Sequence, residues 1–284
     1  MNKQASFANE QIGNDFVSFN DDLEKYVIFE GMTSISAIFH GYEQKINDRR
    51  VVRLLFDREK LTKKQKEYRF LQHKAKEFDF SIELTDEKTL DSITTGKTHG
   101  GIVALCSKRA LPCLEDEMKR ESSAFAQENG FFVLLEGIED PYNFGYTLRS
   151  LYAAGVDGVV LSPRNWMEVA GIVSKSSAGA SEQIPMAIAP SEQAVTLLKS
   201  AGIRVVCAGI RDSVPMTKAN LKRPILLVVG GEKRGISAGV LSCADQIVRI
   251  DYGREFRGSL SAASAATVLS FEVLRHNTEE DTSL

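Results

Sequence analysis

Cysteine is scarce in this sequence, and the few cysteines that it has are far apart. Four occur among the 284 residues, and no two of them form a Cys-x-x-Cys pair. Spacing of this kind favours neither a zinc site nor a framework of disulfides. We therefore expect no bound metal and four buried thiols, at Cys106, Cys113, Cys207 and Cys243.

Long hydrophobic runs and an export signal are lacking too. No run approaches the about 18 apolar residues of a membrane-spanning helix, and residues 1–22 are polar, without a basic segment followed by an apolar one. We expect a cytoplasmic protein that makes no membrane contact. The hydrophobic content of 43% over 284 residues is enough for one large or two modest cores.

Charge is unevenly distributed along the chain. The net charge is −3, but residues 45–76 hold 12 Lys and Arg against 4 Asp and Glu, which leaves −11 for the rest (−3 minus 8). A local excess of cations is typical of a surface that binds nucleic-acid phosphates, although a solvated helix face gives the same pattern. The residues that we expect to contact RNA are Arg49, Arg50, Lys63, Lys64 and Lys66.

The first half of the chain has the pattern of a small α/β domain over residues 23–108, after a loose arm at 1–22. A helix is expected to begin with Thr62 as its N-cap. Its apolar face is expected to hold Tyr68, Leu71, Ala75 and Phe78. Four strands are expected, at 26–29, 51–56, 80–84 and 102–106.

The second half has the pattern of a larger α/β domain over residues 130–277. A linker at 109–129 with a short helix precedes it, and a polar tail at 278–284 follows. Strands that alternate with helices predict a mostly parallel sheet, with the ligand site beyond the carboxyl ends of its strands. Six strands are expected, at 131–135, 158–161, 184–188, 203–207, 225–229 and 246–250.

The first candidate site segment is a strand that turns into a helix, at residues 135–149. It holds Asn143 and Arg149, which lie six residues apart, so that one is near the helix start and the other about two turns further. Asn143 could simply cap the helix, and Arg149 could pair with a carboxylate. Polar residues after a strand of such a sheet are equally suited to bind a ligand.

The second candidate segment, at residues 228–237, is a buried strand that breaks into Gly230, Gly231 and Glu232. Glycines at this place let a ligand approach the backbone closely, although a purely structural turn needs them as well. The segment does not match G-x-x-x-x-G-K-[ST], and no G-x-G-x-x-G occurs in the chain. Neither a P-loop nor a dinucleotide fingerprint is therefore present.

The third candidate segment, at residues 247–266, ends a strand at Ile250 and continues through Tyr252 and a polar loop to Ser259, Leu260 and an alanine-rich helix. Small residues at a helix start permit very close packing, which on its own is a structural explanation.

Together and in this order, the three segments resemble the SpoU/TrmH family of RNA ribose 2′-O-methyltransferases in the SPOUT superfamily. Asn143 and Arg149 match its first motif, residues 231–236 its second, and Ser259-Leu260 with the following helix its third. Residues 177–180 are similar to a further family signature, and residues 99–104 resemble the last strand of the family's L30e-like domain. The resemblance extends over roughly residues 24–277.

The resemblance implies a C-terminal SPOUT α/β domain with a trefoil knot, an L30e-like RNA-binding domain before it, and a homodimer. It also implies S-adenosylmethionine as the methyl donor and rRNA or tRNA as the substrate, with rRNA slightly favoured. The implied catalytic residues are Asn143, Arg149, Glu232, Ser259 and Ser261. The implied methyl-donor site consists of Gly209, Gly230, Gly231, Ile250, Tyr252, Ser259 and Leu260.

The sequence departs from the family pattern at two places. Asp251-Tyr252 stands where the family usually has Pro-Met, and Ser261 stands where it usually has Asn. Serine is shorter and lacks the paired donor and acceptor of an amide. A non-catalytic RNA-binding or ribosome-associated protein is therefore the alternative, and a base-methylating knotted enzyme or an α/β enzyme acting on a small nucleotide would be further ones.

The methyl donor is an activated sulfonium, so the protein has to align the ribose hydroxyl with it and assist loss of the hydroxyl proton. Arginine is normally a permanent cation and a poor base. Our hypothesis is that Arg149, held by Asn143 and Glu232, stabilises negative charge developing on the oxygen, while a substrate phosphate or water takes the proton.

Overall fold

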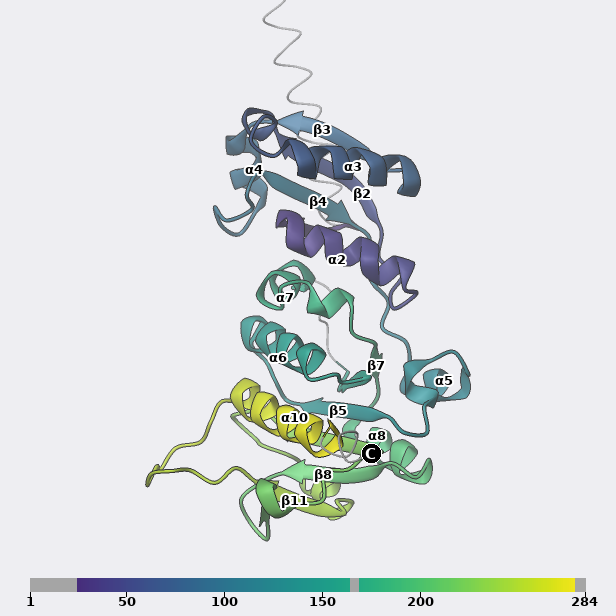
Figure 1. The fold of residues 1–284 in the computed structure, drawn as a ribbon, viewed down its shortest axis with the longest axis vertical. Coiled ribbons are helices and arrows are strands. Elements are labelled where there is room, and N and C mark those ends of the chain that lie inside the picture. Colours follow the sequence, from purple (N-terminus) through teal and green to yellow (C-terminus); the bar gives the residue numbers. More distant parts are fainter. Residues whose placement is uncertain (1–24, 164–168, 279–284) are drawn as a thin grey trace, which may run out of the picture.

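The structure, a computed structural model, describes residues 25–163 and 169–278 and arranges them around two sheets (Figure 1). A four-stranded sheet belongs to the first domain and a seven-stranded sheet to the second. The expected arm at 1–22 lies outside the described residues, as does the expected tail apart from Thr278. No helix in the described ranges is both long and apolar enough to cross a membrane.

The first sheet has the strand order β1-β4-β2-β3, in which β4 is antiparallel to β1 and β2 while β2 and β3 are parallel. All four expected strands are confirmed to within one residue. The strands are β1 (Val27–Glu30), β2 (Val51–Asp57), β3 (Ser81–Thr85) and β4 (Ile102–Cys106). The helices are α2 (Gly31–Glu43), the 3-10 turn η1 (Arg58–Lys60), α3 (Gln65–Phe78) and α4 (Glu87–Ile93).

Helix α3 begins two residues later than the sequence pattern predicts. Lys64 is the N-cap rather than Thr62, because residues 61–64 are taken up by turns that continue from η1. The expected apolar face is confirmed: Leu71 is fully buried, and Tyr68, Ala75 and Phe78 pack against the same core.

The second sheet is parallel throughout, with the order β7-β6-β5-β10-β8-β11-β9. The expected strands are found, and the short β9 is additional. The strands are β5 (Phe131–Glu136), β6 (Gly158–Leu161), β7 (Met186–Ile188), β8 (Arg204–Ala208), β9 (Val214–Pro215), β10 (Ile225–Gly230) and β11 (Gln246–Arg249). The helices are α5 (Leu114–Lys119), α6 (Pro141–Ala153), α7 (Ala170–Ser176), α8 (Ser191–Ser200), α9 (Ala238–Ser242) and α10 (Ala262–Thr278), with 3-10 turns η2 (Ala124–Ala126), η3 (Ala180–Glu182) and η4 (Met216–Lys218).

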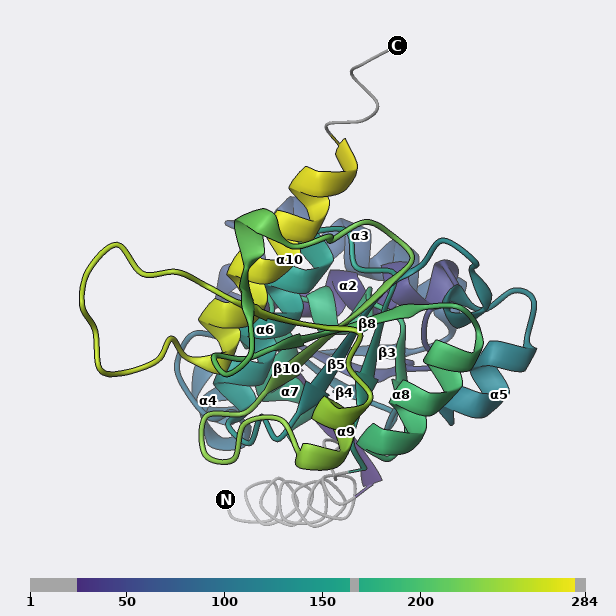
Figure 2. The same ribbon diagram turned by 90° about the horizontal axis from the view of Figure 1, so that it is seen from below.

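Helices cover both faces of this sheet, because its strands are apolar on both sides. In β5, Phe131, Val133 and Leu135 pack with α6, α7 and α10, whereas Phe132 and Leu134 pack with α5, α8 and α9. Figures 1 and 2 show these two helical layers. The predicted linker at 109–129 contains α5 and η2, which belong to the second of these cores rather than to a free connection.

The cysteines differ in exposure, which corrects the expectation of four buried thiols. Cys106 and Cys207 are buried, Cys243 is half-buried and Cys113 is exposed at the start of α5. Cys113 lies at the edge of the sheet, where it forms an isolated bridge to Ile188 of the outermost strand β7. No group of three or more potential ligands is placed to hold a metal among the described residues.

Candidate functional site

A cavity of about 550 Å³ lies at the carboxyl ends of β8, β10 and β11. Because these strands are parallel, their ends and the loops that follow them meet at one edge of the sheet. Apolar side chains from the strands and from α10 line the interior, and the loop at 251–260 lines the mouth. Figure 2 shows this loop, between β11 and α10, projecting from the body of the fold.

All seven residues expected at the methyl-donor site line this one cavity, and so does Glu232. Sequence reasoning missed other lining residues. Ala265 and Leu269 lie one helical turn apart on α10, and this spacing after the third motif could have identified them. The predicted residues in the lining are Gly209, Gly230, Gly231, Ile250, Tyr252, Ser259 and Leu260.

Glycine is required at Gly231 because two strand ends meet there. A Cβ at this position would collide with the Gly137 carbonyl oxygen. The Gly231 N–H donates to the Glu136 carbonyl oxygen at 2.6 Å, and the Gly235 N–H donates to the Gly231 carbonyl oxygen at 2.9 Å. The first and second sequence segments are therefore joined through their backbones.

A second cavity of about 150 Å³ lies beside this junction, and Asn143 and Glu232 line it. Asn143 does not cap α6, because Asp140 does so: its Oδ1 accepts from the Asn143 N–H at 2.7 Å. Glu232 lines both cavities and thereby connects them. The structure thus brings Asn143 and Glu232 together, next to the large cavity.

Arg149 does not lie with Asn143 and Glu232. It lies about 9 Å further along α6, on the exposed side of the helix, and lines neither cavity. In a single chain, Asn143 and Glu232 therefore do not hold Arg149 in the way that our hypothesis requires.

The third segment shows what the two departures from the family pattern do. The Tyr252 hydroxyl accepts a hydrogen bond from the Leu260 N–H at 3.1 Å, and Asp251 pairs with Arg249 at 2.8 Å. Ser261 caps α10, because its Oγ accepts from the Ser264 N–H at 3.2 Å. Serine is among the residues best suited to this position.

The expected RNA-binding residues are placed in two ways. Lys63, Lys66 and Arg50 are exposed, and Lys64 is half-buried near the loop before β4. Arg49 corrects the expectation: its side chain is 2% exposed and donates to Glu182 Oε2 at 2.9 Å and to the Ser107 carbonyl oxygen at 2.6 Å. A phosphate on the surface cannot reach it.

A parallel sheet with a large, glycine-lined cavity at its carboxyl edge defines an α/β cofactor-binding domain. Residues 130–271 match the SpoU rRNA Methylase family, and residues 42–112 match the family described as RNA 2′-O ribose methyltransferase substrate binding. The chain belongs to the SpoU rRNA methylase family. The family expected from the three motifs is confirmed.

Named relatives and solved structures agree with this family. The chain is 30% identical to the 23S rRNA (guanosine-2′-O-)-methyltransferase RlmB of Shewanella oneidensis over 71% of this chain and 80% of the relative. It is 31% identical to the putative TrmH family tRNA/rRNA methyltransferase YacO of Bacillus subtilis, over the same shares. The fold is similar to an AdoMet-bound rRNA methyltransferase from Sinorhizobium meliloti, with a TM-score of 0.71 at 22% identity over 90% of this chain and 89% of that one.

Proposed function

We propose that the protein transfers a methyl group from S-adenosylmethionine to a ribose 2′-hydroxyl of ribosomal or transfer RNA. The observation that carries the proposal is the cavity at the carboxyl edge, around which residues of the second and third motifs meet, with Asn143 of the first motif in the adjoining cavity. The names of the relatives support rRNA or tRNA as the substrate, and RlmB favours rRNA.

The large cavity fits the methyl donor in size and chemistry. Cofactor pockets of about 300–1,000 Å³ are typical, and this one is about 550 Å³. Its interior is apolar, its backbone is accessible at Gly230 and Gly231, and Glu232 supplies a carboxylate at the boundary. S-adenosylmethionine would supply the electrophilic methyl group there, and the protein would exclude water and hold the acceptor.

We assign orientation of the ribose hydroxyl to Asn143 and Glu232, because they line the small cavity that adjoins the large one. An amide and a carboxylate can hold a hydroxyl by donating to it and accepting from it. Fixing the oxygen in this way contributes to the rate through alignment. The proton then passes to a substrate phosphate or to water, and a nearby cation stabilises the oxygen as it loses the proton.

We propose that this cation is Arg149 and that a second copy of the chain supplies it. Arg149 is exposed on α6, together with Tyr142 and Tyr146, which are 49% and 52% exposed. Large exposed aromatics beside a charged residue are typical of an interface core. A homodimer through this part of α6 would bring Arg149 of one protomer to the cavity of the other.

Mixing two inactive variants tests this arrangement. Arg149→Ala keeps the cavity and loses the cation, whereas Ala265→Trp fills the cavity from α10 and keeps the cation. If Arg149 acts on the partner's cavity, the mixed dimer regains methyl transfer. If it acts within its own chain, or if the protein is a monomer, mixing restores nothing.

Titration calorimetry with S-adenosylmethionine tests the proposed activity itself. We expect saturable binding of one molecule per chain, lost in Ala265→Trp and kept in Ala201→Trp, which places the same bulk on an exposed alanine after α8. Gly231 is a poor place for such a block, because any side chain there collides with Gly137.

Unmodified 23S rRNA transcribed in vitro is the second probe. A nucleoside digest should contain 2′-O-methylated ribose, and a methylated base would indicate the base-modifying alternative instead. No cofactor binding at millimolar concentration would favour the non-catalytic RNA-binding protein. The trefoil knot and the cytoplasmic location stay predictions.

A further inference from the structure

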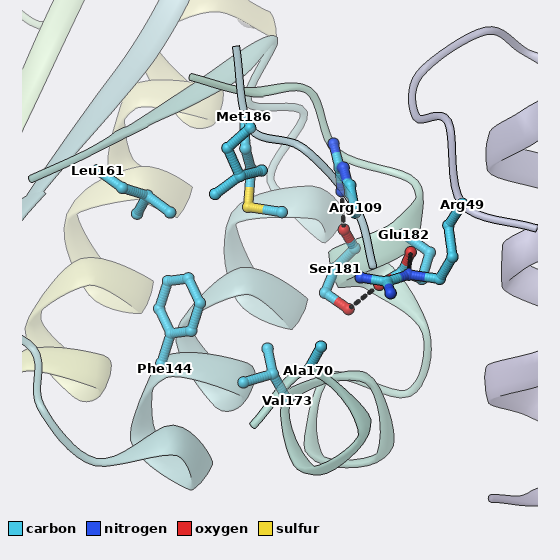
Figure 3. Close-up of a pocket in the computed structure, with 10 residues that line it drawn as sticks. Arg49, Arg109, Phe144, Leu161, Ala170, Val173, Ser181, Glu182 and Met186 are labelled. Atoms are coloured by element: carbon cyan, nitrogen blue, oxygen red, sulfur yellow. Dashed lines mark hydrogen bonds and ion pairs between the residues drawn. The ribbon is translucent and has the colours of Figure 1, made fainter. Parts of the chain in front are cut away.

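The family signature at residues 177–180 has no place in the proposed chemistry, and the structure places it between the two domains. It leads into η3, which contacts α2 of the first domain. Figure 1 shows α2 beside α7, where the two domains meet. Figure 3 shows Arg49 reaching from the first domain toward Glu182 of η3.

The polar part of this interface is buried on both sides. Arg49 and Glu182 form an ion pair at 2.9 Å, with side chains 2% and 3% exposed. The Asn47 amide donates to the Glu182 carbonyl oxygen at 2.6 Å. Arg109 donates to the carbonyl oxygens of Ser181 at 2.8 Å and Ile46 at 3.3 Å, so that it contacts both domains.

The apolar part is built on glycines, which bring the two backbones into direct contact. A Cβ at Gly41 of α2 would collide with the Glu182 carbonyl oxygen, and a Cβ at Gly171 of α7 would collide with the Ile28 carbonyl oxygen. A Cβ at Gly179 would overlap the Ala37 side chain and lie 3.2 Å from the Thr33 carbonyl oxygen. Close contact at three separate glycines leaves little freedom for rotation or sliding.

The interface continues directly to the helix that carries Asn143. A small cavity of about 30 Å³ lies within the interface. Arg49, Arg109 and Glu182 line one side of it, and Phe144 of α6 lines the other. Gly145 of α6 also packs against Ser176 of α7, where a Cβ would collide with the Ser176 hydroxyl. The orientation of the first domain is therefore linked to the position of α6 by contiguous packing.

We infer that Arg49 and Glu182 are positioning residues, which hold the substrate-binding domain in one orientation relative to α6 and the large cavity. A buried ion pair adds little net stability, because desolvation of the two charges offsets their attraction, but it favours the one geometry in which both are paired. RNA held by the exposed lysines would then be presented to the cavity at a fixed distance. The inference rests on the proposed function.

A natural reporter for this orientation lies at the edge of the interface. Lys175 of α7 forms an ion pair with Glu30 of β1, and their side chains are 36% and 10% exposed. A carbodiimide activates the carboxylate, the lysine amine attacks it, and an amide forms as the urea leaves. No spacer is added, so the cross-link forms only while the two groups are in contact.

Four variants separate the roles. Glu182→Gln removes the charge of the pair, and Gly171→Ala separates the backbones without changing charge. Alanine is favourable within a helix by about 1 kcal/mol relative to glycine, so the second variant keeps α7 folded. Glu115→Gln is the matched control, because Glu115 forms an exposed ion pair with Lys119 at 2.7 Å away from the interface. Arg50→Ala removes the exposed neighbour of Arg49.

We expect Glu182→Gln and Gly171→Ala to lose most of the Glu30–Lys175 cross-link, measured by mass spectrometry, and Glu115→Gln and Arg50→Ala to keep it. For 23S rRNA, kcat/KM should fall by about ten- to a hundredfold in the two interface variants, since small misplacement is costly. Affinity for S-adenosylmethionine and for a short oligouridine should change by less than about twofold. Glu115→Gln should match the unaltered protein throughout.

The outcomes distinguish the inference from the proposed function. Loss of the cross-link with unchanged kcat/KM would overturn the positioning role while leaving the activity intact. Retention of the cross-link in both interface variants would overturn it as well. If the unaltered protein transfers no methyl group, the proposed function fails, and the inference fails with it even if the cross-link forms.

Discussion

The hydroxyl of Tyr252 and the backbone amide of Leu260 are joined by a hydrogen bond of 3.1 Å across the mouth of the large cavity. Both residues line that cavity, and the bond closes the loop between them. Methionine, which the family usually has at this position, could not accept such a bond with comparable strength. Tyr252, which replaces the usual methionine, therefore gives this loop an additional hydrogen bond.

Removing that hydroxyl should weaken binding of the methyl donor. Tyr252→Phe loses one hydrogen bond of about 1 kcal/mol, which corresponds to an about fivefold weaker affinity for S-adenosylmethionine by calorimetry. Tyr42→Phe is the matched control, since its hydroxyl accepts from Arg50 at 2.6 Å in the other domain. Equal affinity of the Tyr252→Phe variant and the unaltered protein would contradict the prediction.

Ser261 should matter for stability as the cap of α10. Ser261→Ala should lower the free energy of unfolding by about 1 kcal/mol, and Tm by about 2–4 °C for a chain of this size. Ser261→Asn should keep Tm within about 1 °C, because asparagine caps equally well. Ser92→Ala is the control: its exposed hydroxyl bonds the Thr89 carbonyl oxygen within α4. A melt in which alanine and asparagine behave alike would exclude the capping role.

Exposed lysines of the first domain should make RNA binding depend on salt. Each phosphate contact contributes about 0.7–0.9 to the slope of log K against log salt. The double variant Lys63→Ala and Lys66→Ala should reduce the slope by about 1–2 between 50 and 200 mM salt, measured by fluorescence anisotropy. Lys119→Ala removes an exposed lysine from α5 and should leave the slope unchanged. An unchanged slope in the double variant would assign the phosphate contacts to other residues.

The cysteines should differ sharply in reactivity. Burial raises the pKa of Cys207 to about 12 and raises that of Cys106 further, so both remain thiols at about pH 8. Cys113 is exposed and should be alkylated by iodoacetamide in the native protein, whereas Cys106 and Cys207 should react only after unfolding. Mass spectrometry of the labelled peptides distinguishes these sites, and Cys113→Ser provides the control. Rapid labelling of Cys207 in the folded state would show that its burial is transient.

Much of the second domain could be predicted because its signals are local. Buried parallel strands appear as short apolar runs, and the glycines at 230 and 231 mark where a strand end needs close backbone contact. The short β9 could not be predicted, since Val214 and Pro215 give no periodicity.

In the first domain, the start of α3 could not be predicted to the residue. A threonine is a good cap anywhere, and only the turns after η1 exclude Thr62 as the N-cap.

The roles of two arginines could not be deduced from sequence, because they depend on contacts far along the chain. Arg49 stands in a basic run beside Arg50, yet it pairs with Glu182 across 133 positions. The residues around them in the sequence give no indication that Arg49 is buried and Arg50 is exposed. The distance of Arg149 from Asn143 along the helix follows from the sequence, but only the folded chain shows that Asn143 and Glu232 line a common cavity and that Arg149 lines neither cavity.

The glycine contacts between the domains limit how this chain could be recombined with its relatives. A chimera cut in the 109–129 segment would join a foreign first domain to an α7 whose Gly171 fits the Ile28 backbone of this one. An exchange of the first domain therefore also has to exchange the residues of the second domain that contact it, from α7 to Glu182.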